Sequence, residues 1–217
     1  MSTKELQNLK QSFLKMYSDR LETVLRKRDS EWCKRDIRNG ENLIKIMETV
    51  HDHIKSLSVL MKRLSKSRDL SPKELALLYV FSYLTMAEGG TCNALNYFSY
   101  LLVTMGHDLF SLTKRKYIKD NIEEIRKVEM STKIQFLNHH GFKALTKEYD
   151  STLRNDIAHF NFRTDEKGIV WIKGKPVDLH SKFDSLIKIM DFTIDIATEM
   201  NKRAEDDLAK LQKEVKT

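Results

Sequence analysis

Apolar side chains recur every three or four residues along nearly the whole chain, and few residues interrupt this pattern. The spacing matches the 3.6 residues of an α-helical turn, so each periodic segment would bury one face of a helix. Of the 217 residues, 7 are glycine and 2 are proline. These are too few turn residues for an all-β fold. The sequence therefore predicts an all-α fold, a helical bundle formed by a single domain over residues 1–217.

The first half of the chain divides into helices at recognisable boundaries. We expect a first helix that ends near Arg28, and then a short helix that breaks at Asn39-Gly40. A second long helix would begin at residue 41. Ser71-Pro72 then indicates a new helix start, because serine caps helices and proline suits the first helical position.

The segment from residue 75 to about 105 is the most apolar in the chain. Gly89-Gly90 interrupts it, and we interpret this pair as a place where another helix approaches closely. Short helices are expected near residues 122–128 and 134–137, and a longer helical stretch from Lys143 to about His159. The pattern then changes to two β-rich runs around the turn at residues 165–168, which predicts a hairpin over about 160–173. A closing helix is expected over about 179–213.

The chain carries no sign of a membrane protein or a secreted one. No run of about 18 apolar residues occurs, and the N-terminus lacks the apolar core of a signal peptide. Cys33 and Cys92 are too few for a disulfide framework. We therefore expect a cytoplasmic protein with reduced thiols and no membrane partner.

The chain is basic, with 38 Lys and Arg against 31 Asp and Glu, a formal net charge of +7 and a pI of about 9.2. Such an excess favours an anionic partner such as nucleic acid, although lysine-rich surfaces also serve solubility alone. Basic clusters near residues 26–28 and 62–68 lie at expected helix ends, where they can offset the helix dipole. A third cluster lies in an expected loop and is the better candidate for binding RNA phosphates: Lys114, Arg115, Lys116 and Lys119.

The common motifs for cofactors and metals are missing. The sequence contains no G-x-x-x-x-G-K-[ST], no G-x-G-x-x-G and no H-E-x-x-H. His51 and His53 would point about 200° apart on a helix, so they cannot share a metal ion. We therefore predict no metal site and no cofactor.

One short segment carries a recognisable combination of functional groups, Arg154-Asn155-Asp156-Ile157-Ala158-His159. The string R-N-x-x-x-H resembles the signature of the HEPN superfamily, whose members are α-helical bundles and in many cases metal-independent endoribonucleases. The resemblance implies a HEPN-like bundle with Arg154, Asn155 and His159 as catalytic residues. It also implies a homodimer in which two copies of the motif face each other, and it makes a toxin or defence effector restrained by an inhibitory partner protein a plausible role.

The residue types suit RNA cleavage by the ribose 2′-OH. Histidine can transfer protons near neutral pH, and the planar guanidinium of arginine matches phosphate oxygens. On a regular helix, however, Arg154 points about 140° away from His159. Either the helix begins irregularly at Arg154, or two motifs from a dimer surround one phosphate.

Three other interpretations compete with the nuclease. Arg154 could pair with Glu148 or Asp150 while His159 packs beneath the hairpin aromatics Phe160, Phe162 and Trp171. A HEPN module could instead bind nucleic acid or a nucleotide, or scaffold a partner, without catalysis. The chain could also be a helical interaction protein whose charged C-terminal helix pairs with another chain.

Overall fold

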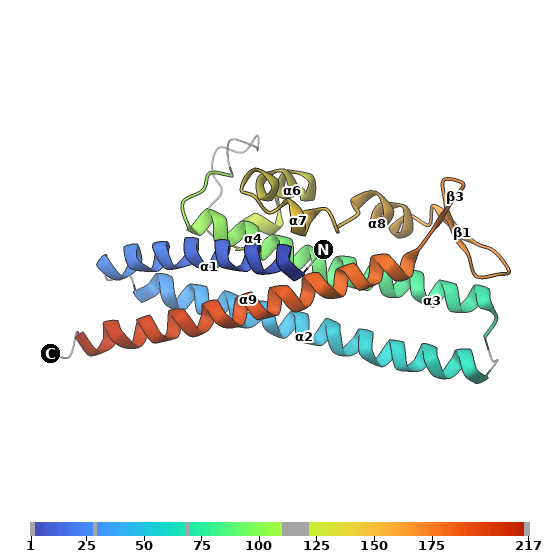
Figure 1. The fold of residues 1–217 in the computed structure, drawn as a ribbon, viewed down its shortest axis with the longest axis horizontal. Coiled ribbons are helices and arrows are strands. Elements are labelled where there is room, and N and C mark those ends of the chain that lie inside the picture. The colour runs from blue at the N-terminus through green and yellow to red at the C-terminus, as the bar shows by residue number, and fades with distance from the viewer. Residues whose placement is uncertain (1–2, 28–29, 68–69, 110–121, 215–217) are drawn as a thin grey trace.

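The computed structural model describes residues 3–27, 30–67, 70–109 and 122–214. Long helices run along the long axis of the molecule, and shorter elements cover one side (Figure 1). The helices are α1 (Thr3–Arg26), α2 (Ser30–Ser67), α3 (Pro72–Thr85), the π-helical segment η1 (Met86–Thr91), α4 (Cys92–Thr104), α5 (Ile122–Arg126), α6 (Met130–His139), α7 (Lys143–Thr146), α8 (Ser151–Ala158) and α9 (Leu179–Glu214). The strands are β1 (Phe162–Thr164), β2 (Val170–Ile172) and β3 (Lys175–Val177).

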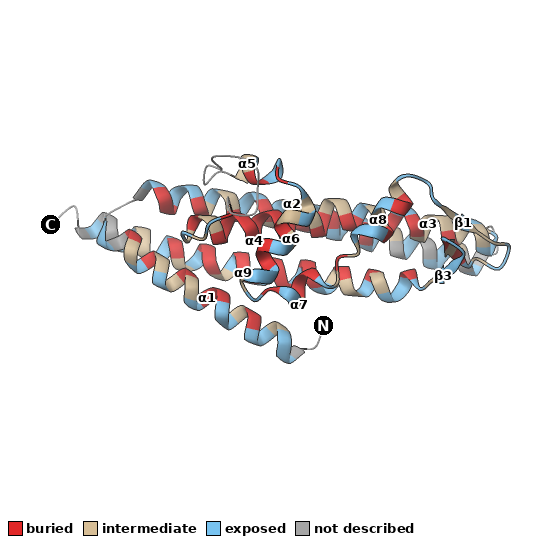
Figure 2. Cartoon of the chain, turned by 90° about the horizontal axis from the view of Figure 1, so that it is seen from above, coloured by how far each residue is buried: buried red, intermediate tan, exposed pale blue. Residues whose placement is uncertain are grey.

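The core lies between the long helices. Helix α9 packs along α2 over much of their lengths, and α1 and η1 also contact α9. Buried residues line the helix faces that point toward one another, whereas exposed residues follow the outer faces (Figure 2). This division explains the apolar spacing in the sequence, because each long helix buries one stripe.

The predicted helix break at Asn39-Gly40 is wrong, because α2 continues through both residues. Gly40 is buried, and a Cβ atom added there would lie 2.0 Å from Oδ1 of Asn201 on α9. The glycine therefore allows close contact between the two helices within an intact helix. Gly40 is therefore a packing residue and does not end the helix.

The predicted start at Ser71 is confirmed. The Ser71 hydroxyl accepts a hydrogen bond from the Glu74 backbone, and the Glu74 carboxylate accepts one from the Ser71 backbone at 2.7 Å. Together they form a capping box with proline at the start of α3.

Close approach at Gly89-Gly90 is also confirmed. An added Cβ on Gly90 would lie 2.5 Å from Sδ of Met190 on α9, and one on Gly89 would lie 3.0 Å from Val50 on α2. The sequence pattern missed that the helix widens into the π-helical segment η1 at this point. Such segments often occur at functional sites.

The helical stretch predicted from Lys143 to His159 is interrupted. Helix α7 ends at Thr146, and α8 begins at Ser151 after a turn. Asp150 causes the new start, because its Oδ1 accepts the Leu153 N–H at 2.9 Å. The motif therefore lies on a short helix with its own N-cap.

The predicted hairpin is present, and a third strand that was not predicted from the sequence extends it. The sheet is antiparallel in the order β1-β2-β3, with Phe162 opposite Ile172 and Ile172 opposite Lys175. The prediction of a helical fold with a small hairpin after the motif is thus confirmed. No helix in the described ranges is both long and apolar enough to cross a membrane.

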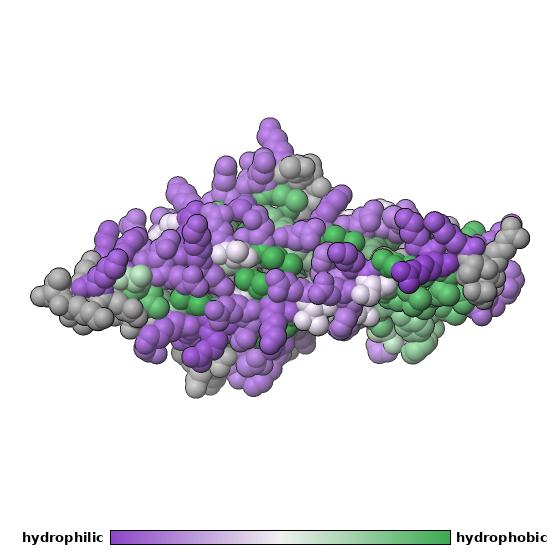
Figure 3. All heavy atoms as spheres, turned by 90° about the horizontal axis from the view of Figure 1, so that it is seen from below, coloured by the Kyte–Doolittle hydropathy of each residue, from purple (hydrophilic) through white to green (hydrophobic). Residues whose placement is uncertain are grey.

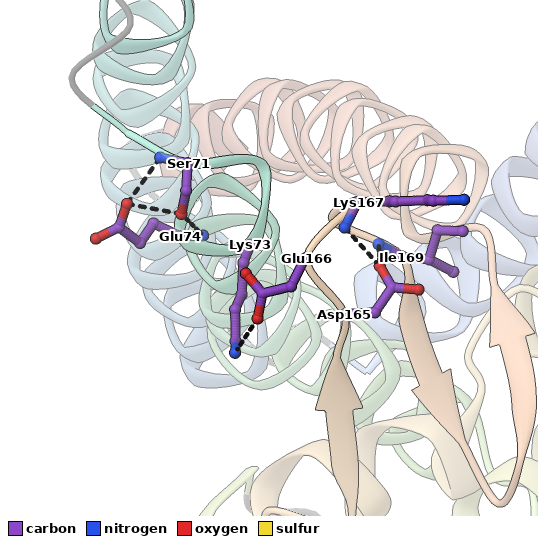
Figure 4. A network of polar contacts seen from close by, with 7 residues as sticks. All are labelled: Ser71, Lys73, Glu74, Asp165, Glu166, Lys167 and Ile169. Atoms are coloured by element: carbon purple, nitrogen blue, oxygen red, sulfur yellow. Dashed lines mark hydrogen bonds and ion pairs between the residues drawn. The ribbon is translucent and has the colours of Figure 1, made fainter.

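The hairpin turn is fastened to the start of α3 (Figure 4). Asp165 Oδ1 accepts the N–H groups of Lys167 and Ile169, and Glu166 forms an ion pair with Lys73 at 2.8 Å. Gly168 has a φ of +78°, and an added Cβ would lie 2.7 Å from the carbonyl oxygen of Pro72. The sheet is therefore held against α3, and it fixes the chain that leaves the motif helix.

Candidate functional site on helix α8

Helix α8 presents the motif residues in different directions. Arg154 lies within the regular helix, and its N–H donates to the Asp150 carbonyl at 3.0 Å. An irregular helix start at Arg154 is therefore excluded. His159 is the C-cap residue, with φ −97° and ψ 13°, and both it and Asn155 are exposed. The motif thus combines a partly covered arginine with a histidine at an open helix end.

The Arg154 guanidinium is held by two acceptors. Its Nη1 donates to Asn155 Oδ1 at 2.6 Å, and its Nη2 forms an ion pair with Glu88 Oε1. The Arg154 side chain is 30% exposed and that of Glu88 is 40% exposed. This pairing replaces the contacts with Glu148 or Asp150 that the alternative interpretation expected. Glu88 comes from η1, so the π-helical segment carries the carboxylate that fixes the motif arginine.

A half-buried thiol, Cys92, and a buried tyrosine, Tyr149, lie next to this ion pair. Cys92 Sγ is 3.4 Å from the Tyr149 hydroxyl and 3.9 Å from Glu88 Oε2. Burial raises the pKa of the Cys92 thiol and that of the Tyr149 hydroxyl, so both stay protonated at neutral pH. The Cys92 thiol can therefore donate to the Glu88 carboxylate, and the Tyr149 hydroxyl can donate to the Cys92 sulfur.

His159 is not packed beneath the hairpin aromatics. Trp171 instead donates its Nε1–H to Asp165 Oδ2 at 3.0 Å, and Arg163 lies 5.4 Å above its ring. Phe160, directly after His159, is 70% exposed. The histidine therefore remains accessible to a ligand or to another protein chain.

Glu88 was not among the site residues predicted from the sequence. Its signal was a single carboxylate within an otherwise apolar helix, next to Gly89. That signal did not identify the partner, because 66 positions separate Glu88 from Arg154 and only the fold brings them together.

The predicted RNA-binding residues Lys114, Arg115, Lys116 and Lys119 lie outside the described residues. Other lysines lie closer to the motif helix. A groove of about 530 Å³ separates α8 from the sheet and the start of α9, and Lys173 and Lys182 on its rim pair with Asp156 and Asp150. Thr152, Leu153 and Asp156 line it, so it lies on a different face of α8 from Arg154.

Within the described ranges, no three His, Cys, Asp or Glu side chains are placed to hold a metal ion. Comparison of the chain with protein-family models, with curated proteins and with solved structures finds no match. The candidate site is therefore defined by its own geometry: Arg154 is held by Glu88 and Asn155, and His159 is exposed at the end of the same helix.

Proposed function

We propose that this chain is an endoribonuclease of the HEPN type that cleaves RNA without a metal ion, at a site formed by two protomers. The observation that carries the proposal is the Glu88-Arg154-Asn155 arrangement on α8, together with the exposed His159 at the end of the same helix. A fixed guanidinium can bind a phosphate, and an accessible imidazole can transfer a proton.

The proposed reaction needs two proton transfers. One histidine removes the proton from the ribose 2′-OH, and the 2′ oxygen attacks phosphorus. The bond from phosphorus to the 5′ oxygen breaks, and a second histidine protonates that oxygen. The products are a 2′,3′-cyclic phosphate and a 5′-hydroxyl. DNA is not a substrate, since it has no 2′-OH.

Two histidines require two protomers, because each chain supplies one copy of the motif. An apolar stripe on α3 supports a contact at this position. We define the α3 stripe as Leu77, Phe81 and Leu84, which recur at helical spacing; Phe81 is exposed, and Leu77 and Leu84 are half-buried. Helix α3 also contacts α8 and β1. A second protomer on the α3 stripe would therefore meet the first beside its motif.

The test is cleavage of single-stranded RNA by the purified protein in EDTA. Wild type is compared with Arg154→Ala and His159→Ala, and oligomeric state is measured on the same samples. We expect cyclic phosphate ends with wild type, and a loss of at least 100-fold in either variant. His51→Ala is a matched control, because it removes an exposed histidine of α2. Cleavage that survives in both motif variants would contradict the proposal.

One observation favours a second function, a HEPN module that binds RNA without cleaving it. The charge of Arg154 is already matched by Glu88, so the arginine could be structural. This alternative predicts salt-dependent RNA binding, no cleavage, and an affinity that His159→Ala leaves unchanged. A partner protein that inhibits the nuclease, and a role as a toxin or defence effector, remain part of the first proposal.

A further inference from the structure

Phe160 combines two unfavourable features directly after the motif. Its φ is +57°, a left-handed conformation that glycine normally adopts at the end of a helix, and its side chain is 70% exposed. The conformation is fixed by the helix end, because the Phe160 N–H donates to the Ile157 carbonyl at 3.0 Å and the Asn161 N–H to that of Asp156 at 2.7 Å. A glycine would suit this backbone better. Strain of this kind, kept for an exposed aromatic ring, points to a function for the ring.

Two further aromatic rings, Phe81 and Phe162, pack against Phe160. The phenylalanine cluster, which we define as Phe81, Phe160 and Phe162, has centroid distances from Phe160 of 6.4 Å to Phe81 and 6.3 Å to Phe162. The Phe81 ring meets Phe160 edge-on at 64°, and the Phe162 ring is nearly parallel to it at 21°. Because the sheet is fastened to α3, the cluster is carried on a rigid support.

The charges around the cluster are positive or already paired. Arg163 is exposed, and its guanidinium lies over the Trp171 ring, whereas Arg154 is already paired with Glu88. The nearby carboxylates are occupied, since Asp156 pairs with Lys173 at 2.9 Å and Asp165 accepts hydrogen bonds within the hairpin. An exposed aromatic ring with an exposed arginine three residues further along the chain suits a nucleobase and its phosphates.

We propose that Phe160 stacks on a nucleobase of single-stranded RNA, one nucleotide from the phosphate at which His159 acts. This inference rests on the proposed function and adds how the substrate is held. Stacking is tolerant of base identity, so the contact would favour unpaired RNA over a duplex without strict sequence preference.

The test measures binding and cleavage separately. Binding uses oligoribonucleotides with 2′-O-methyl groups, which lack the attacking hydroxyl, and a parallel set with one abasic position moved along the strand. Phe160→Leu keeps the apolar bulk and the backbone strain but removes the aromatic face, whereas Phe160→Trp enlarges it. Ile169→Ala is a matched control, because it shortens another exposed apolar side chain of the same hairpin.

We expect Phe160→Leu to weaken binding by about 5- to 100-fold, and Phe160→Trp to match or exceed wild type. At one abasic position, wild type should bind the RNA more weakly than it binds intact RNA. Phe160→Leu should bind that abasic RNA and intact RNA equally well. Equal binding by wild type and Phe160→Leu would overturn the inference, as would a shift of the unliganded Phe160→Leu protein from dimer to monomer. If wild type shows the expected binding pattern but never cleaves unmodified RNA, the stacking role holds and the proposed nuclease fails.

Discussion

At the scale of single residues, Asp36 makes the stability of the fold depend on pH. Its side chain is buried, and the Tyr17 hydroxyl donates to Oδ2 at 2.7 Å. Burial raises the pKa of Asp36 to about 6. An unfolded chain loses this proton near pH 3.9. The folded protein therefore holds the proton more tightly, and this contribution to stability is full below about pH 4 and falls as the pH rises to about 6.

We predict that Asp36→Asn removes this dependence, because the amide keeps an acceptor for Tyr17 and cannot ionise. Relative to wild type, the variant should gain about 2 kcal/mol of unfolding free energy between pH 4 and pH 7. Urea unfolding across this range measures the difference. Asp52→Asn, at an exposed position of the same helix, should follow wild type. Parallel curves for Asp36→Asn and wild type would show that the buried carboxyl does not control the pH dependence.

Glu88 tests whether the motif arginine must be held in place. Its ion pair with Arg154 is partly exposed, so Glu88→Gln should change the unfolding free energy by no more than about 1 kcal/mol. If the proposed nuclease is correct, the freed guanidinium should lower kcat about 10-fold and leave the pH profile of cleavage unchanged. Steady-state kinetics and thermal unfolding on the same samples separate the two effects.

Glu123→Gln is the control for Glu88→Gln. It breaks a Glu–Arg pair of 2.7 Å on α5, away from the motif. An equal fall in kcat for the two variants, or a large loss of stability for Glu88→Gln, would show that Glu88 has no specific positioning role.

At the scale of whole helices, contact between α2 and α9 depends on Gly40. A Cβ there would overlap the buried Asn201 side chain, whose Oδ1 has no hydrogen-bond partner in the described part of the chain. We predict that Gly40→Ala destabilises the protein by about 2 kcal/mol, because the overlap outweighs the better helix propensity of alanine. Chemical unfolding measures this value.

The matched double variant isolates the cause. Asn201→Ala removes the atoms that the new methyl group would meet, so Gly40→Ala should cost less in that background. A coupling of at least about 1 kcal/mol is expected. Additive effects would mean that Gly40→Ala acts through something other than its contact with Asn201.

The helices also show which features local sequence can predict. The capping box at Ser71 was predictable, because its partners lie three residues apart. The role of Gly40 was not, because a glycine that ends a helix and one that admits a neighbour look alike until the neighbour is known. Asp150 likewise could have capped a new helix or continued a polar face. For the site, the motif residues were visible as a string, but the Glu88 contact depended on the fold.

At the scale of the whole molecule, two exposed apolar regions compete as the place where a second protomer would bind. One is the α3 stripe beside the motif, where Phe81 is 45% exposed. The other is on α2, where Val59 is 45% and Leu60 is 47% exposed. Apolar surface gathers at the end of the molecule that carries the sheet, the start of α3 and the end of α2 (Figure 3). Exposed area alone therefore does not identify the interface.

If the proposed nuclease is correct, its shared site distinguishes the two regions, because two motifs can bind one phosphate only if the interface lies beside α8. We predict that Phe81→Glu shifts the protein from dimer to monomer and abolishes RNA cleavage, since each seam would then bury two unpaired carboxylates. Val59→Glu adds the same charge at equal exposure and should leave both properties unchanged. Sedimentation and cleavage assays over a range of protein concentrations measure the oligomeric state and the activity together. The specific activity of wild type should fall when the protein is diluted below the dimer dissociation constant. If Val59→Glu dissociates the dimer while Phe81→Glu does not, the motifs of the two chains face apart, and a shared site on α8 is excluded.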